Sequence, residues 1–148
     1  MYYVKLGAAG LLALLIAIQL VPYRVYNPPV TQNADWSSPE VEALARRACF
    51  DCHSNEVKTP WYGYIAPFAW AVRYHVDEAR ENLNFSTLDL PQKEAHEAGE
   101  MIEEREMPPS YYLTLHPEAQ LTDAEWETLE KGLDTTLRPH FRKEKDHH

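Results

Sequence analysis

The chain of 148 residues contains little of what several common kinds of site require. It has 5 glycines and no glycine-rich loop of the phosphate-binding kind, and no residue pattern typical of a hydrolytic or nucleophilic triad. It has 2 cysteines, so none is left over for a structural disulfide if both serve one site. Runs of alternating β-branched residues are missing as well. We therefore expect an all-α protein that is not an enzyme.

Positive charge is scarce in most of the chain. Residues 25–148 contain 12 of the 14 basic residues but all 23 acidic ones. Such a balance disfavours phosphate-rich partners, so we expect no nucleic-acid partner. A basic redox partner protein, or a fixed place in a complex, fits this charge better. The commoner meaning of such a balance is a merely solvated acidic surface, and this alternative stays open.

The long apolar run of the chain is at its N-terminus. Gln19 is the only strongly polar residue in the segment 6–21, and Lys5 precedes this segment. Counted from Tyr2, the run just reaches the ~20 residues that a bilayer span needs. No small-x-small cleavage site and no lipid-anchor cysteine follow it. We therefore expect residues 1–23 to form an uncleaved signal anchor, a single transmembrane helix, rather than a removed signal peptide or a buried core helix.

Proline and helix signals divide the rest of the chain. Residues 24–37 contain Asn27-Pro28-Pro29 and are predicted to form an extended, Pro-rich linker. Residues 38–140 are predicted to form a helical domain, and residues 141–148 a charged tail. Within the domain, apolar periodicity and capping signals predict helices from Pro39 to Ala48, from Phe68 to Leu83, from Pro91 to about Arg105, and from the capping box Thr122-Asp123-Ala124-Glu125 to just before Pro139.

The first of these helices leads directly into Cys49-Phe50-Asp51-Cys52-His53, a C-x-x-C-H motif. This pattern is typical of c-type haem attachment, because two thiols at this spacing can each add to one vinyl group of a porphyrin. The histidine that follows can then ligate the iron. A structural zinc would need a second Cys or His pair at a matching spacing. A thioredoxin-like dithiol would need a βαβ context, whereas the flanks look helical, and a chance match is the remaining alternative. We predict one covalent haem c held by Cys49, Cys52 and His53.

The second axial ligand of the iron has several candidates. We favour Met107, because Pro108-Pro109 holds it in a stiff loop after a helix, and a Met–His pair raises the haem potential. His75 is the alternative, and would give a bis-histidine haem of lower potential. Met101 fits core filling better than ligation. The histidines at positions 96, 116 and 140 are weaker candidates, and an open site is also possible.

Aromatic residues cluster in the segment 54–67 after the motif. Trp61 and Tyr62 could form one wall of a porphyrin site, in which case they would contact the haem. The alternative is that they are ordinary core residues.

Several ordered motifs resemble the haem-binding domain family of bacterial membrane-anchored monohaem c-type cytochromes. They are Cys49-Phe50-Asp51-Cys52-His53-Ser54-Asn55, Thr59-Pro60-Trp61-Tyr62, Ile65-Ala66-Pro67, Trp70, His75-Val76, Leu83-Asn84-Phe85-Ser86, Met107-Pro108-Pro109-x-x-Tyr112 and Leu115-His116-Pro117-Glu118-Ala119. The resemblance covers nearly the whole chain to about Leu137, with Phe68-Ala69 as a departure from the family pattern. It implies covalent haem c and a cytochrome c-like fold, and says little about the redox partners.

The motif and the resemblance together predict electron transfer by a membrane-anchored monohaem cytochrome with His53 and Met107 as axial ligands. Bacteria attach haem to C-x-x-C-H outside the cytoplasm, so we expect a single-pass protein of the inner membrane with its haem domain in the periplasm. One alternative is a haem-based sensor or binder of small gases with an open iron site. Another is an electron-relay subunit of a larger membrane complex.

Overall fold

The structure, a computed structural model, describes the backbone of residues 1–145 and the side chains of residues 1–141. Across these residues the protein is all-α, as expected, and the only β-type pairing is an isolated bridge between Gln32 and Thr87. The α-helices are α1 (Tyr2–Ile18), α2 (Pro39–Ala48), α3 (Phe50–His53), α4 (Phe68–Asn82), α5 (Ala98–Glu103), α6 (Ser110–Leu115) and α7 (Asp123–Lys145). Three 3₁₀-helices connect them: η1 (Trp61–Tyr64), η2 (Ala95–Glu97) and η3 (Pro117–Ala119).

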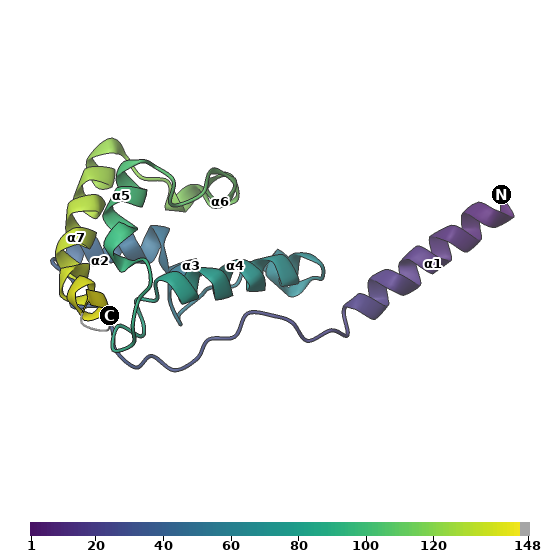
Figure 1. Ribbon diagram of the computed structural model, residues 1–148. Helices are drawn as coiled ribbons and strands as arrows, with labels where there is room; N and C mark the ends of the chain where they lie inside the picture. The colour runs from purple at the N-terminus through teal and green to yellow at the C-terminus, as the bar shows by residue number, and fades with distance from the viewer. Residues whose placement is uncertain (146–148) are drawn as a thin grey trace.

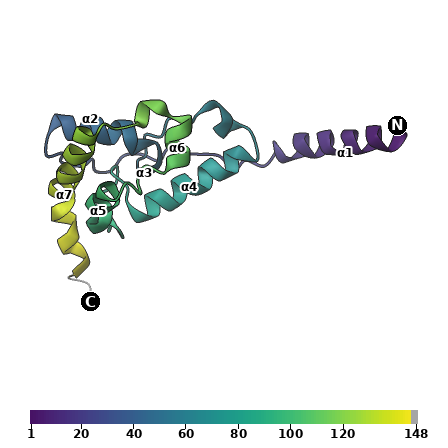
Figure 2. The ribbon, with the colours of Figure 1, turned by 90° about the horizontal axis from the view of Figure 1, so that it is seen from above.

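Helix α1 projects away from the other helices, as Figures 1 and 2 show, and none of its residues is buried. It has 17 residues and ends at Ile18, a few residues before Pro22, which cannot continue a helix. In the described part of the chain, no helix is both long enough and apolar enough to cross a membrane. The expected transmembrane helix over residues 1–23 is therefore not supported.

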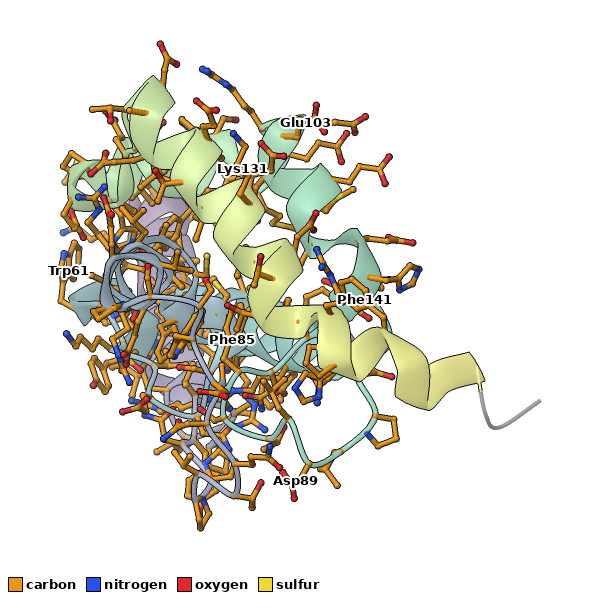
Figure 3. All side chains as sticks on the ribbon, turned by 90° about the vertical axis from the view of Figure 1, so that its left-hand side faces the viewer. Trp61, Phe85, Asp89, Glu103, Lys131 and Phe141 are labelled. Carbon is orange, nitrogen blue, oxygen red and sulfur yellow. The ribbon has the colours of Figure 1, made fainter. Side chains whose placement is uncertain are left out.

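The hydrophobic core lies where α7 packs against α2 and α5. Figure 3 looks at this side of the molecule and shows α7 running across it. Leu129, Leu133 and Leu137 of α7 are completely or almost completely buried. The core continues into three rings: Phe50 and Phe85 stack with centroids 5.7 Å apart, and Trp36 packs against both. Since Phe50 belongs to the C-x-x-C-H motif, the core directly fixes the position of that motif.

Helix α2 forms as the sequence predicts. The Ser38 hydroxyl accepts a hydrogen bond from the Val41 N–H at 3.2 Å, and Pro39 occupies the first helical position. The apolar stripe that includes Val41 and Leu44 is buried against α7. The helix ends at Ala48, immediately before the first cysteine of the motif. The packing of α2 against α7 therefore determines where that cysteine lies.

Helix α7 begins as predicted but ends later than predicted. The Thr122 N–H donates to the Glu125 carboxylate at 2.8 Å, and the Glu125 N–H points back to the Thr122 hydroxyl at 3.4 Å, which is a capping box. The predicted end before Pro139 is wrong, because the helix continues to Lys145 with Pro139 inside it. Phe141 packs against the core beyond the proline, and this contact offsets the lost backbone hydrogen bond. Residues 146–148 of the predicted tail lie outside the described residues.

The predicted helix from Pro91 to Arg105 is wrong in its first half. Helix η2 begins only at Ala95 and α5 only at Ala98. The segment before them is a loop built around the buried side chain of Gln92, whose amide N–H donates to the carbonyl oxygens of Thr87 and Leu90 at 2.8 and 3.0 Å. Helix α4, in contrast, agrees with its prediction to within one residue.

Candidate functional site

A cleft of about 390 Å³ opens between the C-x-x-C-H motif, the C-terminal half of α4, α5, and the segment from Met107 to Tyr112. Its size is within the range of ~300–1,000 Å³ that small-molecule and cofactor sites occupy. Most of its wall is apolar. The lining includes six residues that the sequence singled out: Cys49, Cys52, His53, His75, Met101 and Met107.

One helical turn places the three residues of the motif on the same side. The N–H groups of Cys52 and His53 both donate to the carbonyl oxygen of Cys49, at 3.1 and 2.9 Å. Residues three and four positions apart on a helix are neighbours, so Cys49, Cys52 and His53 share one face. Phe50 lies on the other side and is buried in the core. The turn therefore presents two thiols and an imidazole to the cleft while its opposite face is held by packing.

The imidazole of His53 is oriented by the backbone. Its Nδ1 lies 2.9 Å from the carbonyl oxygen of Leu83, and because that oxygen can only accept, Nδ1 carries the proton and donates it. Burial lowers the pKa of His53, and backbone carbonyl oxygens of Leu83 and Ala79 partly offset this effect. The ring is therefore neutral at pH 7, with the Nε2 lone pair free. A histidine held in this way by its other nitrogen is the usual form of a metal-ligating histidine.

The loop that supplies the Leu83 carbonyl is fixed by buried polar side chains. The Asn84 amide donates to Asn55 Oδ1 at 2.9 Å, and the Asn55 N–H donates to the Ser86 hydroxyl at 2.9 Å. The N–H of Phe85 also donates to the carbonyl oxygen of His53 at 2.9 Å. Each of these groups is paired, as buried polar groups must be to be tolerated. The segment 83–86 thus holds both the main chain and the ring of His53.

Both cysteines are unbridged thiols. Burial, with a smaller contribution from the neighbouring Cys52, raises the pKa of Cys49 to about 12. Burial also raises the pKa of Cys52 to about 11, with a smaller contribution from the charge of Asp51. C-x-x-C pairs that exchange disulfides do the opposite, because their sites lower the thiol pKa. This environment therefore argues against the thioredoxin-like alternative.

Met107 reaches the cleft from a sharp chain reversal after α5. The N–H groups of Glu106 and Met107 both donate to the carbonyl oxygen of Met101, at 3.0 and 3.2 Å. Between them and α5 lies Arg105, whose φ of 58° is in the left-handed region that ends many helices. Pro108 follows and is buried. Met107, which is 39% exposed, lines the same cleft as the residues of the motif.

Helix α6 fastens this loop to the motif. The Tyr112 hydroxyl donates to Asp51 Oδ2 at 3.2 Å, which links α6 to the motif. The Tyr112 ring also stacks on the His116 imidazole, with centroids 4.2 Å apart and planes at 17°. The hydroxyl oxygen of Tyr62 lies 2.9 Å from His116 Nε2, and Oε1 of Glu118 lies 3.1 Å from His116 Nδ1. These contacts join three segments that are far apart in the sequence.

Comparison with known proteins bears directly on this cleft. A family model described as haem-binding domain matches residues 13–135, which include the motif, the loop 83–86 and the segment from Met107 to Tyr112. The chain belongs to the haem-binding domain family. Neither the curated proteins nor the solved structures contain a match to the chain. The donor set fits the group that the family name implies, since this haem-binding domain brings two thiols, a neutral imidazole and a thioether to one apolar cleft.

Two residues predicted to contact the haem lie elsewhere. Trp61 and Tyr62 do not line the cleft of the haem-binding domain, and Trp61 is 76% exposed on η1. Tyr62 instead pairs with His116. The physical reason is that η1 immediately precedes α4 and packs on it, whereas the cleft is lined by the C-terminal half of that helix.

The other weaker candidates are also separated from the cleft, since none of the histidines at positions 96, 116 and 140 lines it. His75 does line it, on the exposed side of α4, with its ring 6.0 Å from that of Tyr111. The structure therefore leaves Met107, Met101 and His75 within the cleft as possible second ligands.

Sequence reasoning missed several residues of this haem-binding domain that form the cleft. The aromatic lining comes from Phe85, Tyr111 and Tyr112 rather than from the segment 54–67. A signal for them was present, because Phe85 and Tyr112 both lie in motifs of the family resemblance. The role of the Leu83 carbonyl had no signal, since any residue can supply a backbone oxygen.

Proposed function

We propose that this haem-binding domain carries one covalently attached haem c and transfers electrons as a monohaem c-type cytochrome. The observation that supports it most is that a single cleft is lined by both thiols of the motif, by a neutral His53 and by Met107. His53 would supply one axial ligand through Nε2, the nitrogen that its bond to Leu83 leaves available. Met107 would supply the other.

Attachment of the haem needs no oxidant and no leaving group. Each thiol would add across one vinyl group, with sulfur bonded to one carbon and the thiol hydrogen to the neighbouring carbon. Cys49 and Cys52 are both protonated at neutral pH and lie on one helical face, which suits this addition. Two thioether bonds then hold the group beside His53.

In this proposal the protein is an electron carrier and not a catalyst. The haem iron supplies the redox change, and the chain binds it, excludes water from it and sets its potential. A His–Met ligand pair stabilises ferrous iron and so raises the potential. The apolar cleft wall acts in the same direction, because it disfavours the more highly charged ferric state.

The proposal is tested by producing the full chain in a bacterial host that attaches haem to C-x-x-C-H motifs. We expect the intact mass to increase by one haem, and the haem to stay with the protein after denaturation. The matched control is the Cys49→Ala/Cys52→Ala double variant, which should lose the covalent mass. An unmodified mass for the wild-type chain in a host that matures other cytochromes would contradict covalent attachment.

We further propose that the domain faces the periplasm at the bacterial inner membrane, to which the apolar N-terminal segment attaches it. Its partners would be redox proteins, either free or in a larger membrane complex. Protease treatment of spheroplasts should degrade the domain, and gentle detergent extraction should show whether it co-migrates with a complex. Protection from protease in intact spheroplasts would contradict the periplasmic orientation.

A haem-based binder of small gases is the second candidate. One observation favours it: Met107 is partly exposed, and His75 and Met101 share the cleft, so the second ligand site could be labile. Ready binding of carbon monoxide by the reduced protein at neutral pH would support this candidate over a closed His–Met site.

A further inference from the structure

Four large apolar side chains are exposed together at one corner of the domain, at η1 and the first turn of α4. Trp61 is 76% exposed, Tyr64 56%, Ile65 46% and Phe68 61%. We call this group the aromatic corner. None of the four lines the cleft. Figure 3 places Trp61 at the edge of the molecule opposite Phe141, away from the core of α5 and α7. The haem site therefore gives no reason for their exposure.

The aromatic corner is joined to helix α1 by specific hydrogen bonds. The side-chain amide of Gln19 pairs with the backbone of Ala66 in both directions, with N–O distances of 3.0 and 2.9 Å. Arg24 Nη1 donates to the carbonyl oxygen of Tyr64 at 2.8 Å and Nη2 to that of Gln19 at 3.3 Å. These bonds hold the C-terminal end of α1 on the corner. Figures 1 and 2 both show α1 leaving the domain from this end.

The apolar surface continues from the corner into α1. Leu20 and Val21, between the helix and Arg24, are 81% and 45% exposed. None of the residues of α1 is buried, and its apolar side chains point in all directions. A helix that packs on a protein surface needs only one apolar stripe, so an all-round apolar helix fits a lipid environment better than a protein groove.

The segment that carries the corner lacks acidic residues, unlike most of the chain after Asp35. From Val57 to Val76 there is no acidic residue, although the chain contains 23 of them. The same segment contains two basic residues, Lys58 and Arg73. A segment without acidic residues and rich in Trp and Tyr matches the head-group region of a bilayer, where these rings are enriched and where anionic lipids repel carboxylates.

We infer that the aromatic corner is a lipid-contact surface, which lies in the head-group region of the membrane to which α1 attaches. The inference rests on the membrane attachment proposed above, but not on haem binding or electron transfer. Phe68 of the corner and His75 of the cleft lining are seven positions apart on α4, a rise of ~10 Å along the helix, so the corner and the cleft occupy different parts of α4.

The test uses the full chain with vesicles of phosphatidylethanolamine and phosphatidylglycerol. A photo-reactive benzoylphenylalanine replaces Trp61, Phe68 or Leu90 in separate proteins. Leu90 is the matched control, because it is 54% exposed and apolar but lies in the loop before η2. Flotation first reports attachment, and mass spectrometry after illumination then reports lipid adducts. An unchanged far-UV circular dichroism spectrum shows that each variant keeps its helices.

We expect the chain to float with the vesicles and lipid adducts to form at positions 61 and 68 but not at 90. Flotation without adducts at 61 and 68 would overturn the lipid-contact surface while leaving the attachment intact. Loss of flotation would overturn both. If, in bacterial membranes, positions 61 and 68 cross-link to a protein and not to lipid, the corner is a protein interface and the inference is wrong. None of these outcomes depends on the axial ligands.

Discussion

The hydroxyl of Tyr112 donates a hydrogen bond to Oδ2 of Asp51 at 3.2 Å, and this bond joins α6 to the turn that carries the two cysteines. Asp51 stands between those cysteines in the sequence, and its other oxygen accepts from the Lys58 N–H at 3.0 Å. Tyr112 follows Met107 by five positions and is held from the other side by the stacked ring of His116. The two walls of the cleft are thus connected by a side-chain contact between residues 61 positions apart.

Replacing Tyr112 by Phe should loosen the Met107 loop. The change removes one half-buried hydrogen bond to a carboxylate, so we expect the free energy of unfolding to fall by about 1–2 kcal/mol. Carbon monoxide should also bind the reduced protein faster, because the loop opens more often. Denaturant unfolding and stopped-flow absorption measure the two effects.

Tyr111→Phe is the matched control, since Tyr111 is 60% exposed and its hydroxyl has no hydrogen bond among the described residues. This variant should keep the stability and the carbon monoxide kinetics of the wild type. Equal losses in both variants would mean that the contact with Asp51 does not hold the loop.

The raised pKa of Tyr112 predicts how the stability of the folded protein depends on pH. Burial raises its pKa above the usual value, and the negative charge of Asp51 raises it further. The unfolded chain loses the phenolic proton at about pH 10, while the folded protein keeps it to higher pH. The contribution of Tyr112 to stability is therefore complete below about pH 10 and decreases as the pH rises above it. Tyr112→Phe should show a smaller loss of stability than the wild type between about pH 9 and pH 11. Parallel curves for the two proteins would contradict the raised pKa.

Met107→Ala tests whether Met107, rather than Met101, is the second ligand of the iron. If Met107 ligates the iron, the variant should have a lower reduction potential, and its reduced form should bind carbon monoxide at neutral pH. Met101→Ala is the control, because Met101 lines the same cleft from α5 but is half-buried in the manner of a core residue. It should keep the potential and reduce stability only. Potentiometric titration and absorption spectra distinguish the two variants. A large fall in potential for Met101→Ala alone would mean that Met101, and not Met107, is the second ligand.

The sequence predicted those parts of the site that depend on neighbours along the chain. The C-x-x-C-H motif, the Ser38 cap that starts the helix before it, and the Thr122–Glu125 box are all local patterns, and all three have the expected structural setting. Met107 was also placed in the cleft by a local argument, from the prolines that follow it.

Contacts between distant segments could not be predicted in the same way. The His53 ring is oriented by the Leu83 carbonyl, and no side chain marks that oxygen in the sequence. The loop around Gln92 replaces a predicted helical turn because a buried amide binds two carbonyl groups. Trp61 looked like a haem contact by composition, but which way a ring faces depends on the packing of η1 on α4.

Substitution of Gly132 tests the packing that supports the motif, because this residue lies where α7 crosses α2. A Cβ at this position would come within 2.6 Å of Val41 Cγ1 and closer still to Cγ2. Val41 is only 4% exposed and has no space into which to move. Gly132→Ala should therefore lower the free energy of unfolding by about 1–3 kcal/mol, despite the higher helix propensity of alanine.

The matched variant is Gly99→Ala on α5, where a Cβ would meet only the end of the Asp134 side chain, with Cγ at 2.9 Å. Asp134 is exposed and can rotate away, so we expect no loss of stability, and a gain of up to ~1 kcal/mol from helix propensity. Adding Val41→Ala to Gly132→Ala should recover part of the loss, because it removes the methyl groups that clash. Denaturant unfolding of the haem-loaded proteins measures all three. If Gly132→Ala proved as stable as Gly99→Ala, α2 and α7 would have room to separate, and the motif would not depend on this crossing for its position.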